Sequence, residues 1–186
     1  MPSWSVTSSV LVVAMLVCTR AQPESPSKGL SEYQVKAAFL YNFVKFVEWP
    51  ATPAAREGPI EICVLGKDPF RGALERVVEA KTVKDRTLVI RHIGDIAAAR
   101  SCQVLFVSAS EAGSVSEIIR AVRGWNVLTV SEIDRFSERG GIINFLMEGQ
   151  RVRFRINTKM AASAGLTISS KLLELAVGRP EDKEQD

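Results

Sequence analysis

The sequence predicts a single α/β domain: a largely parallel, Rossmann-like sheet flanked by helices, with a C-terminal β-hairpin that adds antiparallel character. Three observations lead to this fold class. Short apolar runs alternate with helical patterns through the middle of the chain, and two strand-like runs joined by a glycine-containing turn follow near the C-terminus. The 186 residues, 46% hydrophobic and 24% charged, suit one domain with a substantial core.

The C-terminal hairpin is the clearest element. An apolar run at 142–147 leads through a turn at 148–150 into a run at 151–156 in which arginine and apolar residues alternate strictly. Successive side chains of a strand point to opposite faces, so three arginines share one face and three apolar residues share the other. The first strand is therefore expected to be buried, and the second to keep one basic face toward solvent.

Two short helices are expected after the hairpin. Asn157 or Thr158 can cap the first helix, and Gly165 suits its left-handed stop because glycine has no Cβ. Ser169 and Ser170 can cap the last helix through their side-chain oxygens.

The middle of the chain supplies the alternating elements. After the first strand, the glycine-bounded segment 66–72 matches neither the P-loop nor the dinucleotide-binding pattern, so no nucleotide site is predicted there. Asp68 is expected to cap the next helix, with Pro69 at its first position. The expected strands are 60–65, 88–93, 104–107 and 127–130, and the expected helical segments are 70–80, 96–100 and 110–123.

The N-terminal helix of the domain is amphipathic with a wide apolar arc. Ser31 followed by Gln34 is a capping-box pattern that starts it. Leu40, Tyr41 and Val44 widen the arc beyond what one core contact needs, so they form a candidate interface for a partner or a homodimer. The alternative is a helix that only packs on the core.

The two ends of the chain are expected to lie outside the domain. The apolar run 10–17 is too short to span a bilayer, and the small residues Thr19 and Ala21 fit a secretory cleavage site just after Ala21. Lipidation at Cys18 and an uncleaved anchor are the alternatives. The expected organisation is a signal peptide at 1–21, a flexible linker at 22–30, the α/β domain at 31–178 and a disordered acidic tail at 179–186.

Cleavage would leave two cysteines, Cys63 and Cys102, whose spacing fits no tight metal motif. Cys63 lies in the first expected strand and Cys102 just before the third. These strands are commonly neighbours in a doubly wound sheet, and thiols within reach pair in an oxidising compartment. A disulfide is therefore expected, with two buried free thiols as the alternative.

Two basic features are candidate binding surfaces. Arg151, Arg153 and Arg155 would repel one another unless anions are nearby, which favours docking of an acidic partner, although charge on an edge strand also prevents unwanted strand pairing. The segment 169–171, which comprises Ser169, Ser170 and Lys171, is a possible anion site at a helix N-terminus. Simple helix capping is the alternative interpretation.

Several function classes are disfavoured by composition. The formal charge of +3 gives little support to nucleic-acid binding, and a single histidine cannot supply a multi-histidine metal site. No nucleophile–base pair is recognisable, and the serines at 108 and 110 lack the nucleophile-elbow context. The sequence therefore predicts a protein that is not an enzyme and needs no cofactor or metal.

Two long motifs at opposite ends of the domain resemble the YfiR family. The first is 33–50, YQVKAAFLYNFVKFVEWP; the second comprises 152–157 (VRFRIN), 161–166 (AASAGL) and 168–173 (ISSKLL). Members of that family are periplasmic regulators that restrain a membrane-bound diguanylate cyclase. The resemblance implies a periplasmic location, a disulfide at positions matching Cys63 and Cys102, and a possible second partner, an OmpA-like outer-membrane lipoprotein.

The resemblance makes the periplasmic sensor region of an inner-membrane diguanylate cyclase the expected partner, so that docking would control cyclic di-GMP output. Other sensors, such as histidine kinases, are alternatives. A rival function is a periplasmic small-molecule binding protein, with a pocket near Phe145, Arg153, Asn157 and the turn at Ser169 and Ser170.

Overall fold

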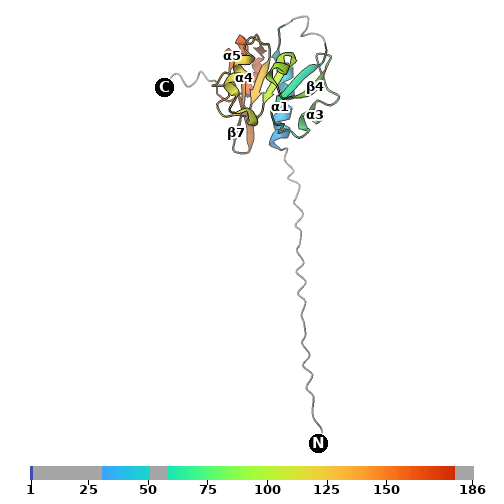
Figure 1. The fold of residues 1–186 in the computed structure, drawn as a ribbon. Coiled ribbons are helices and arrows are strands. Elements are labelled where there is room, and N and C mark those ends of the chain that lie inside the picture. Colours follow the sequence, from blue (N-terminus) through green and yellow to red (C-terminus); the bar gives the residue numbers. More distant parts are fainter. Residues whose placement is uncertain (2–30, 51–57, 179–186) are drawn as a thin grey trace.

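The computed structural model describes residues 31–50 and 58–178, besides Met1. The expected signal peptide, linker and acidic tail therefore lie outside the described residues. The described part folds into a seven-stranded, mostly parallel sheet with helices on both faces and a separate two-stranded sheet (Figure 1). The predicted fold class is confirmed.

The order of the seven strands is β3-β4-β2-β5-β6-β7-β8. The five central strands are parallel to one another, and the two edge strands run antiparallel to their neighbours. The parallel strands are β2 (Ile60–Leu65), β4 (Arg86–Ile93), β5 (Val104–Val107), β6 (Leu128–Ser131) and β7 (Ile143–Glu148), and the edge strands are β3 (Thr82–Val83) and β8 (Arg151–Ile156).

The chain changes direction across the sheet between β2 and β5. From β2 it passes to β4 on one side, then returns to β5 on the other side, and each later strand adds beyond the last. Such a reversal is the topological switch point of a doubly wound sheet. The strands expected at 60–65 and 104–107 have these bounds and lie side by side, as predicted.

Three two-residue strands of the described chain were not predicted from the sequence: β1 (Val47–Glu48), β3 and β9 (Thr167–Ile168). Strand β3 is the one that joins the large sheet. It pairs two residues with the start of β4 through a turn in which Lys84 and Asp85 have φ of 52° and 61°. Two residues are too few to show an alternating pattern, which explains why the sequence alone does not reveal them.

Alternation within the strands divides the core into two layers. Ile62 and Val64 of β2 face the layer that contains α1 (Glu32–Phe46), α3 (Ala73–Val78) and α6 (Ser170–Leu175). Cys63 and Leu65 face the layer that contains α4 (Val115–Ala121) and the 3₁₀ helix η1 (Ile96–Ser101). The central strands β2, β5 and β6 are buried on both faces, as their apolar runs indicate.

The predicted interface on helix α1 is wrong for Leu40 and Val44. Their exposed fractions are 0% and 2%, because α1 packs at once against α3, α6 and strand β8. The wide apolar arc of α1 is thus covered by several contacts inside the domain. Tyr41 is half-buried, and Lys81 Nζ lies 4.6 Å from the centre of its ring.

Two helices begin later than predicted. Asp68 Oδ1 accepts a hydrogen bond from Phe70 N, but Arg71 and Gly72 then adopt positive φ, so α3 starts only after Gly72 and Asp68 does not cap it. Similarly, a short 3₁₀ turn, η2 (Ala109–Glu111), precedes α4 where one longer helix was expected. Local turns override the helical periodicity at both sites.

The C-terminal unit agrees with its capping signals. Asn157 Oδ1 accepts a hydrogen bond from Met160 N at the start of α5 (Thr158–Ser163), and Gly165 follows with φ of 71°. Strand β9 (Thr167–Ile168) then pairs with β1 (Val47–Glu48), which joins this unit to the end of α1. Among the described residues, no helix has both the length and the apolar character needed to cross a membrane.

Candidate functional site

The arginine face, defined as Arg151, Arg153 and Arg155, lies on one side of the β7–β8 hairpin. The apolar residues between the arginines are buried on the other side. Arg153 Nε lies 3.4 Å from Glu148 Oε2 without making a hydrogen bond. Neither Arg151 nor Arg155 forms an ion pair with any residue of the described chain. The predicted cationic stripe is present, and two of its charges are available to an anionic partner.

Strand β8 is an edge strand, but its edge is partly covered. Val177 N donates a hydrogen bond to Phe154 O, at 2.9 Å, so the chain after α6 runs along this part of the strand. A partner strand could not pair along all of β8 without displacing that segment. The arginine face, and not the backbone edge, is therefore the accessible surface of the hairpin.

Phe145 does not contribute to a surface site. It is 2% exposed and its ring centre lies 5.8 Å from that of Phe43, on the face opposite to Arg153. Asn157 caps α5 and donates a hydrogen bond to Ser137 O. The structure does not gather these residues into the pocket expected at the hairpin, and the prediction of a partner contact at Phe145 is wrong.

The segment 169–171 caps the last helix. Ser169 Oγ accepts a hydrogen bond from Leu172 N, so the capping interpretation is confirmed. Ser170 and Lys171 are exposed. A role for this segment in anion binding stays a prediction.

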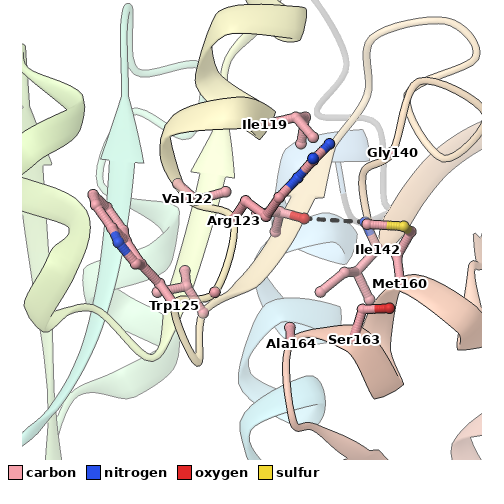
Figure 2. A pocket seen from close by; sticks show the side chains of 12 residues that line it. Ile119, Val122, Arg123, Trp125, Gly140, Ile142, Met160, Ser163 and Ala164 are labelled. Carbon is pink, nitrogen blue, oxygen red and sulfur yellow. Dashed lines mark hydrogen bonds between the residues drawn. The ribbon is translucent and has the colours of Figure 1, made fainter.

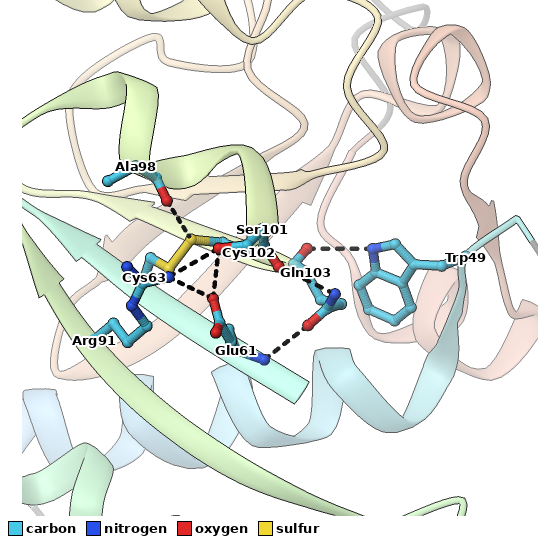
Figure 3. The surroundings of a disulfide bond; sticks show 8 residues. All are labelled: Trp49, Glu61, Cys63, Arg91, Ala98, Ser101, Cys102 and Gln103. Carbon is cyan, nitrogen blue, oxygen red and sulfur yellow. Dashed lines mark hydrogen bonds and ion pairs between the residues drawn. A yellow bond between two sulfur atoms is a disulfide. The ribbon is translucent and has the colours of Figure 1, made fainter. Parts of the chain in front are cut away.

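The predicted disulfide is present and joins the two core strands (Figure 3). Cys63 in β2 and Cys102, just before β5, have Cα atoms 6.0 Å apart and are 0% and 2% exposed. The alternative of two free thiols is wrong. Glu61 lies near both sulfurs, but these three possible ligands do not make a metal site, because disulfide sulfurs are not thiolates.

A polar network beside the disulfide links β2, β4 and the segment that leads into β5 (Figure 3). Glu61 Oε2 of β2 accepts hydrogen bonds from Arg91 Nη1 of β4 at 2.6 Å and from Ser101 Oγ at 2.7 Å. Gln103 Oε1 accepts from Glu61 N, and Trp49 Nε1 donates to Gln103 O. The donors and acceptors of this network are paired with one another, so the network stabilises this part of the sheet.

A small cavity lies between α4, β6 and α5 (Figure 2). Its volume is about 40 Å³, and Ile119, Val122, Trp125 and Met160 are among the residues that line it. A ligand pocket usually has at least ~300 Å³. This cavity has room for a few water molecules and is no ligand site.

A much larger hollow, the switch-point cleft, lies at the carboxyl ends of β2, β5 and β6. Its volume is about 720 Å³. Its walls are the start of α1, the loop 66–72, the segment 108–110 and Glu132. Sequence reasoning missed this cleft because it treated each segment separately, although all three strand-following segments were recognisable.

An ion cluster around the buried Lys36 lies behind one wall of the switch-point cleft, which Tyr33 and Glu132 line. Lys36 Nζ of α1, with a side chain only 3% exposed, pairs with both Glu32 and Glu132, and Tyr33 Oη donates a hydrogen bond to Glu132 Oε1 at 3.2 Å. Burial by itself would lower the pKa of Lys36, but the two carboxylates outweigh it and hold that pKa above its usual value. Burial, and then the charge of Glu132, raise the pKa of Tyr33. At neutral pH the cluster therefore holds α1 to the end of β6 by charge.

Two solved structures are similar to this chain. A conserved domain protein from Vibrio cholerae O1 biovar El Tor matches 81% of this chain and 60% of its own, with a TM-score of 0.55 and 14% sequence identity. An ABC domain in complex with L-Trp from Streptococcus pneumoniae matches 64% of this chain and 54% of its own, with a TM-score of 0.46 and 13% identity. The chain thus spans less than two thirds of either protein. The first match supports the fold alone, and the second is too dissimilar to support a structural conclusion.

The family comparison covers nearly the whole described domain. A family model described as YfiR/HmsC-like matches residues 33–177, which include both of the long motifs noted in the sequence. The match begins in α1 and ends just beyond α6. This chain belongs to the YfiR/HmsC-like family.

Proposed function

We propose that this protein is a periplasmic regulator that binds the periplasmic sensor region of an inner-membrane signalling protein and restrains its output. The proposed partner is a diguanylate cyclase, so that docking lowers cyclic di-GMP and release raises it. Membership of the YfiR/HmsC-like family supports the regulatory role. The arginine face is the observation on which the proposed docking surface rests.

The physical argument for docking concerns uncompensated charge. Among the described residues Arg151 and Arg155 have no ion pair, and the strand holds them on the same face, about 14 Å apart. An acidic surface on the partner would neutralise them and would also steer association. Because β8 is fixed by its hairpin partner β7 and by the core beneath it, the charges are already positioned before docking.

Restraint of the partner requires a difference in affinity. The regulator must bind the inactive conformation of the sensor more tightly than the active conformation, and the ratio of the two affinities sets how far the equilibrium shifts. An OmpA-like outer-membrane lipoprotein that competes for the regulator would release the sensor by mass action. A histidine kinase in place of the cyclase would keep this mechanism and change the output.

Binding, and not catalysis, is proposed for the polar groups of the domain. The serines at the end of β5 are engaged with backbone: Ser108 Oγ donates a hydrogen bond to Lys67 O, and Ser110 Oγ accepts one from Lys67 N. Neither serine forms a hydrogen bond with the single histidine, His92, which lies beside Asp68 and Glu75.

The first test is crosslinking of cell envelopes followed by capture of the tagged protein and mass spectrometry of what it carries. Recovery of a membrane protein with a periplasmic sensor and a cytoplasmic cyclase domain is expected. A kinase in its place would revise the output, and capture of no membrane protein would contradict the proposal.

The second test reverses charge on the arginine face. The double variant Arg151→Glu with Arg155→Glu should weaken binding to the purified sensor region by roughly a hundredfold, since each charge-assisted contact contributes about 1.5–3 kcal/mol. The matched control, Arg120→Glu with Arg123→Glu, changes the same charge at exposed positions near α4. Equal affinity of the first variant and the wild type would exclude the arginine face as the docking surface.

A further inference from the structure

We propose that the switch-point cleft binds a small polyanion carrying phosphate or carboxylate groups, which Lys67, Arg71 and Arg76 hold. This inference goes beyond the proposed docking function, because it assigns the domain a ligand of its own at a place distant in sequence from the arginine face. It differs from the pocket that the sequence suggested, which lay at the C-terminal hairpin.

The first argument is position. In open α/β sheets, ligands bind outside the carboxyl ends of the strands, at the point where the strand order reverses. Here the reversal lies between β2 and β5, and the cleft opens over the segments that follow these two strands and β6. Its volume of about 720 Å³ falls within the range that small-molecule sites occupy, ~300–1,000 Å³.

The second argument is that hydrogen bonds hold the rim of the cleft in place before any ligand binds. Both the carbonyl and the N–H of Lys67 are hydrogen-bonded to serines that follow β5, at 2.6 Å and 3.0 Å. Gly66 permits this contact: its φ is 86°, and a Cβ there would lie 2.4 Å from Ser110 Oγ. Arg71 also has positive φ, 50°, a conformation that costs free energy in a residue with a side chain and is found disproportionately at ligand sites.

The third argument is charge balance. The carboxylates that line the cleft already have partners inside the domain: Glu132 pairs with Lys36, and Asp68 accepts a hydrogen bond from Phe70 N while its other oxygen lies 3.5 Å from His92 Nε2. The cations are not compensated. Within the described chain no side chain forms an ion pair with Lys67, Arg71 or Arg76, all of which are exposed. The uncompensated charge of the cleft is therefore positive.

The fourth argument concerns the chemistry of the ligand. The two guanidinium groups match the planar, two-oxygen geometry of carboxylate and phosphate, and the ammonium of Lys67 adds a third charge. Phe70 also lines the cleft, and its ring is held by edge-to-face packing on Tyr33 at 5.7 Å and on Phe106 at 4.8 Å. A ligand with several anionic groups on a compact skeleton fits this combination.

The test uses the purified protein without any partner, so that its outcome is independent of docking. Inorganic phosphate, pyrophosphate and citrate are titrated separately, with backbone amide shifts by NMR and heats by calorimetry as readouts. We expect saturable binding of at least one of the two polyanions, with shifts concentrated in 66–72 and 108–110. Preference between pyrophosphate and citrate distinguishes a phosphate from a carboxylate ligand.

Charge reversal then locates the site. Arg71→Glu with Arg76→Glu should weaken binding by about tenfold or more for each lost contact. The matched control, Arg120→Glu with Arg123→Glu, should bind as the wild type does. All four positions are exposed, and thermal melting checks that each variant is folded. Absence of saturable binding for all three probes, shifts confined to 151–155, or an equal loss in the control would each overturn the proposal.

Discussion

Breaking the Cys63–Cys102 disulfide should lower the thermal stability of this domain substantially. The bond closes a loop with a sequence separation of 39 residues. In the chain-entropy treatment, opening a loop of this length restores conformational freedom to the unfolded chain that corresponds to about 4 kcal/mol. A domain of this size loses roughly 2–4 °C of Tm for each kcal/mol, so reduction should lower Tm by roughly 8–16 °C.

The comparison that isolates the covalent bond is the wild type in oxidised and in reduced form. Both sulfurs are buried, so the protein is reduced while unfolded, refolded under reductant, and checked for two additional free thiols by mass spectrometry. Calorimetry then gives both melting temperatures. The double variant Cys63→Ala with Cys102→Ala is the control, and its Tm should not respond to reductant.

The result that would refute the reasoning is equal Tm for the oxidised and reduced forms with the free thiols verified. It would mean that the neighbouring network around Glu61 and Arg91 holds β2, β4 and η1 together without help from the bond. A response of the double-alanine variant to reductant would show that the effect does not come from these two sulfurs.

Three further predictions concern buried contacts. Lys36→Met should lower the free energy of unfolding, measured in urea, by about 3 kcal/mol, because Glu132 then keeps a largely buried charge without its partner. Adding Glu132→Gln should recover part of that loss. If the double variant recovers nothing, the ion-cluster interpretation is contradicted. Folding raises the pKa of Lys36, so the ion pair with Glu132 contributes its full stabilisation of the folded state below the unfolded-state pKa of about 10.5. That contribution should be lost as the pH rises through the folded-state pKa. Gly141→Ala should cost about 1–3 kcal/mol, because a Cβ there would lie 2.1 Å from the buried ring of Phe136; unchanged melting would show that the ring moves freely.

The sequence determined the elements that local chemistry specifies. The central strands β2 and β5 have the predicted bounds because continuous apolar runs bounded by polar turns allow few other structures. Asn157, Gly165 and Ser169 act as the capping signals indicated, since caps depend only on neighbouring residues. The alternation of β8 likewise fixed which side of the strand carries the arginines.

The tertiary structure decided which of the candidate residues share a surface. Leu40, Val44 and Phe145 are buried because α1 meets several elements from distant parts of the chain, which periodicity cannot foresee. The same holds for the switch-point cleft. The strand order brings the segments after β2, β5 and β6 together, and periodicity does not reveal that order. Local sequence specifies a residue's conformation and face, but what covers that face is set by contacts between residues far apart along the chain.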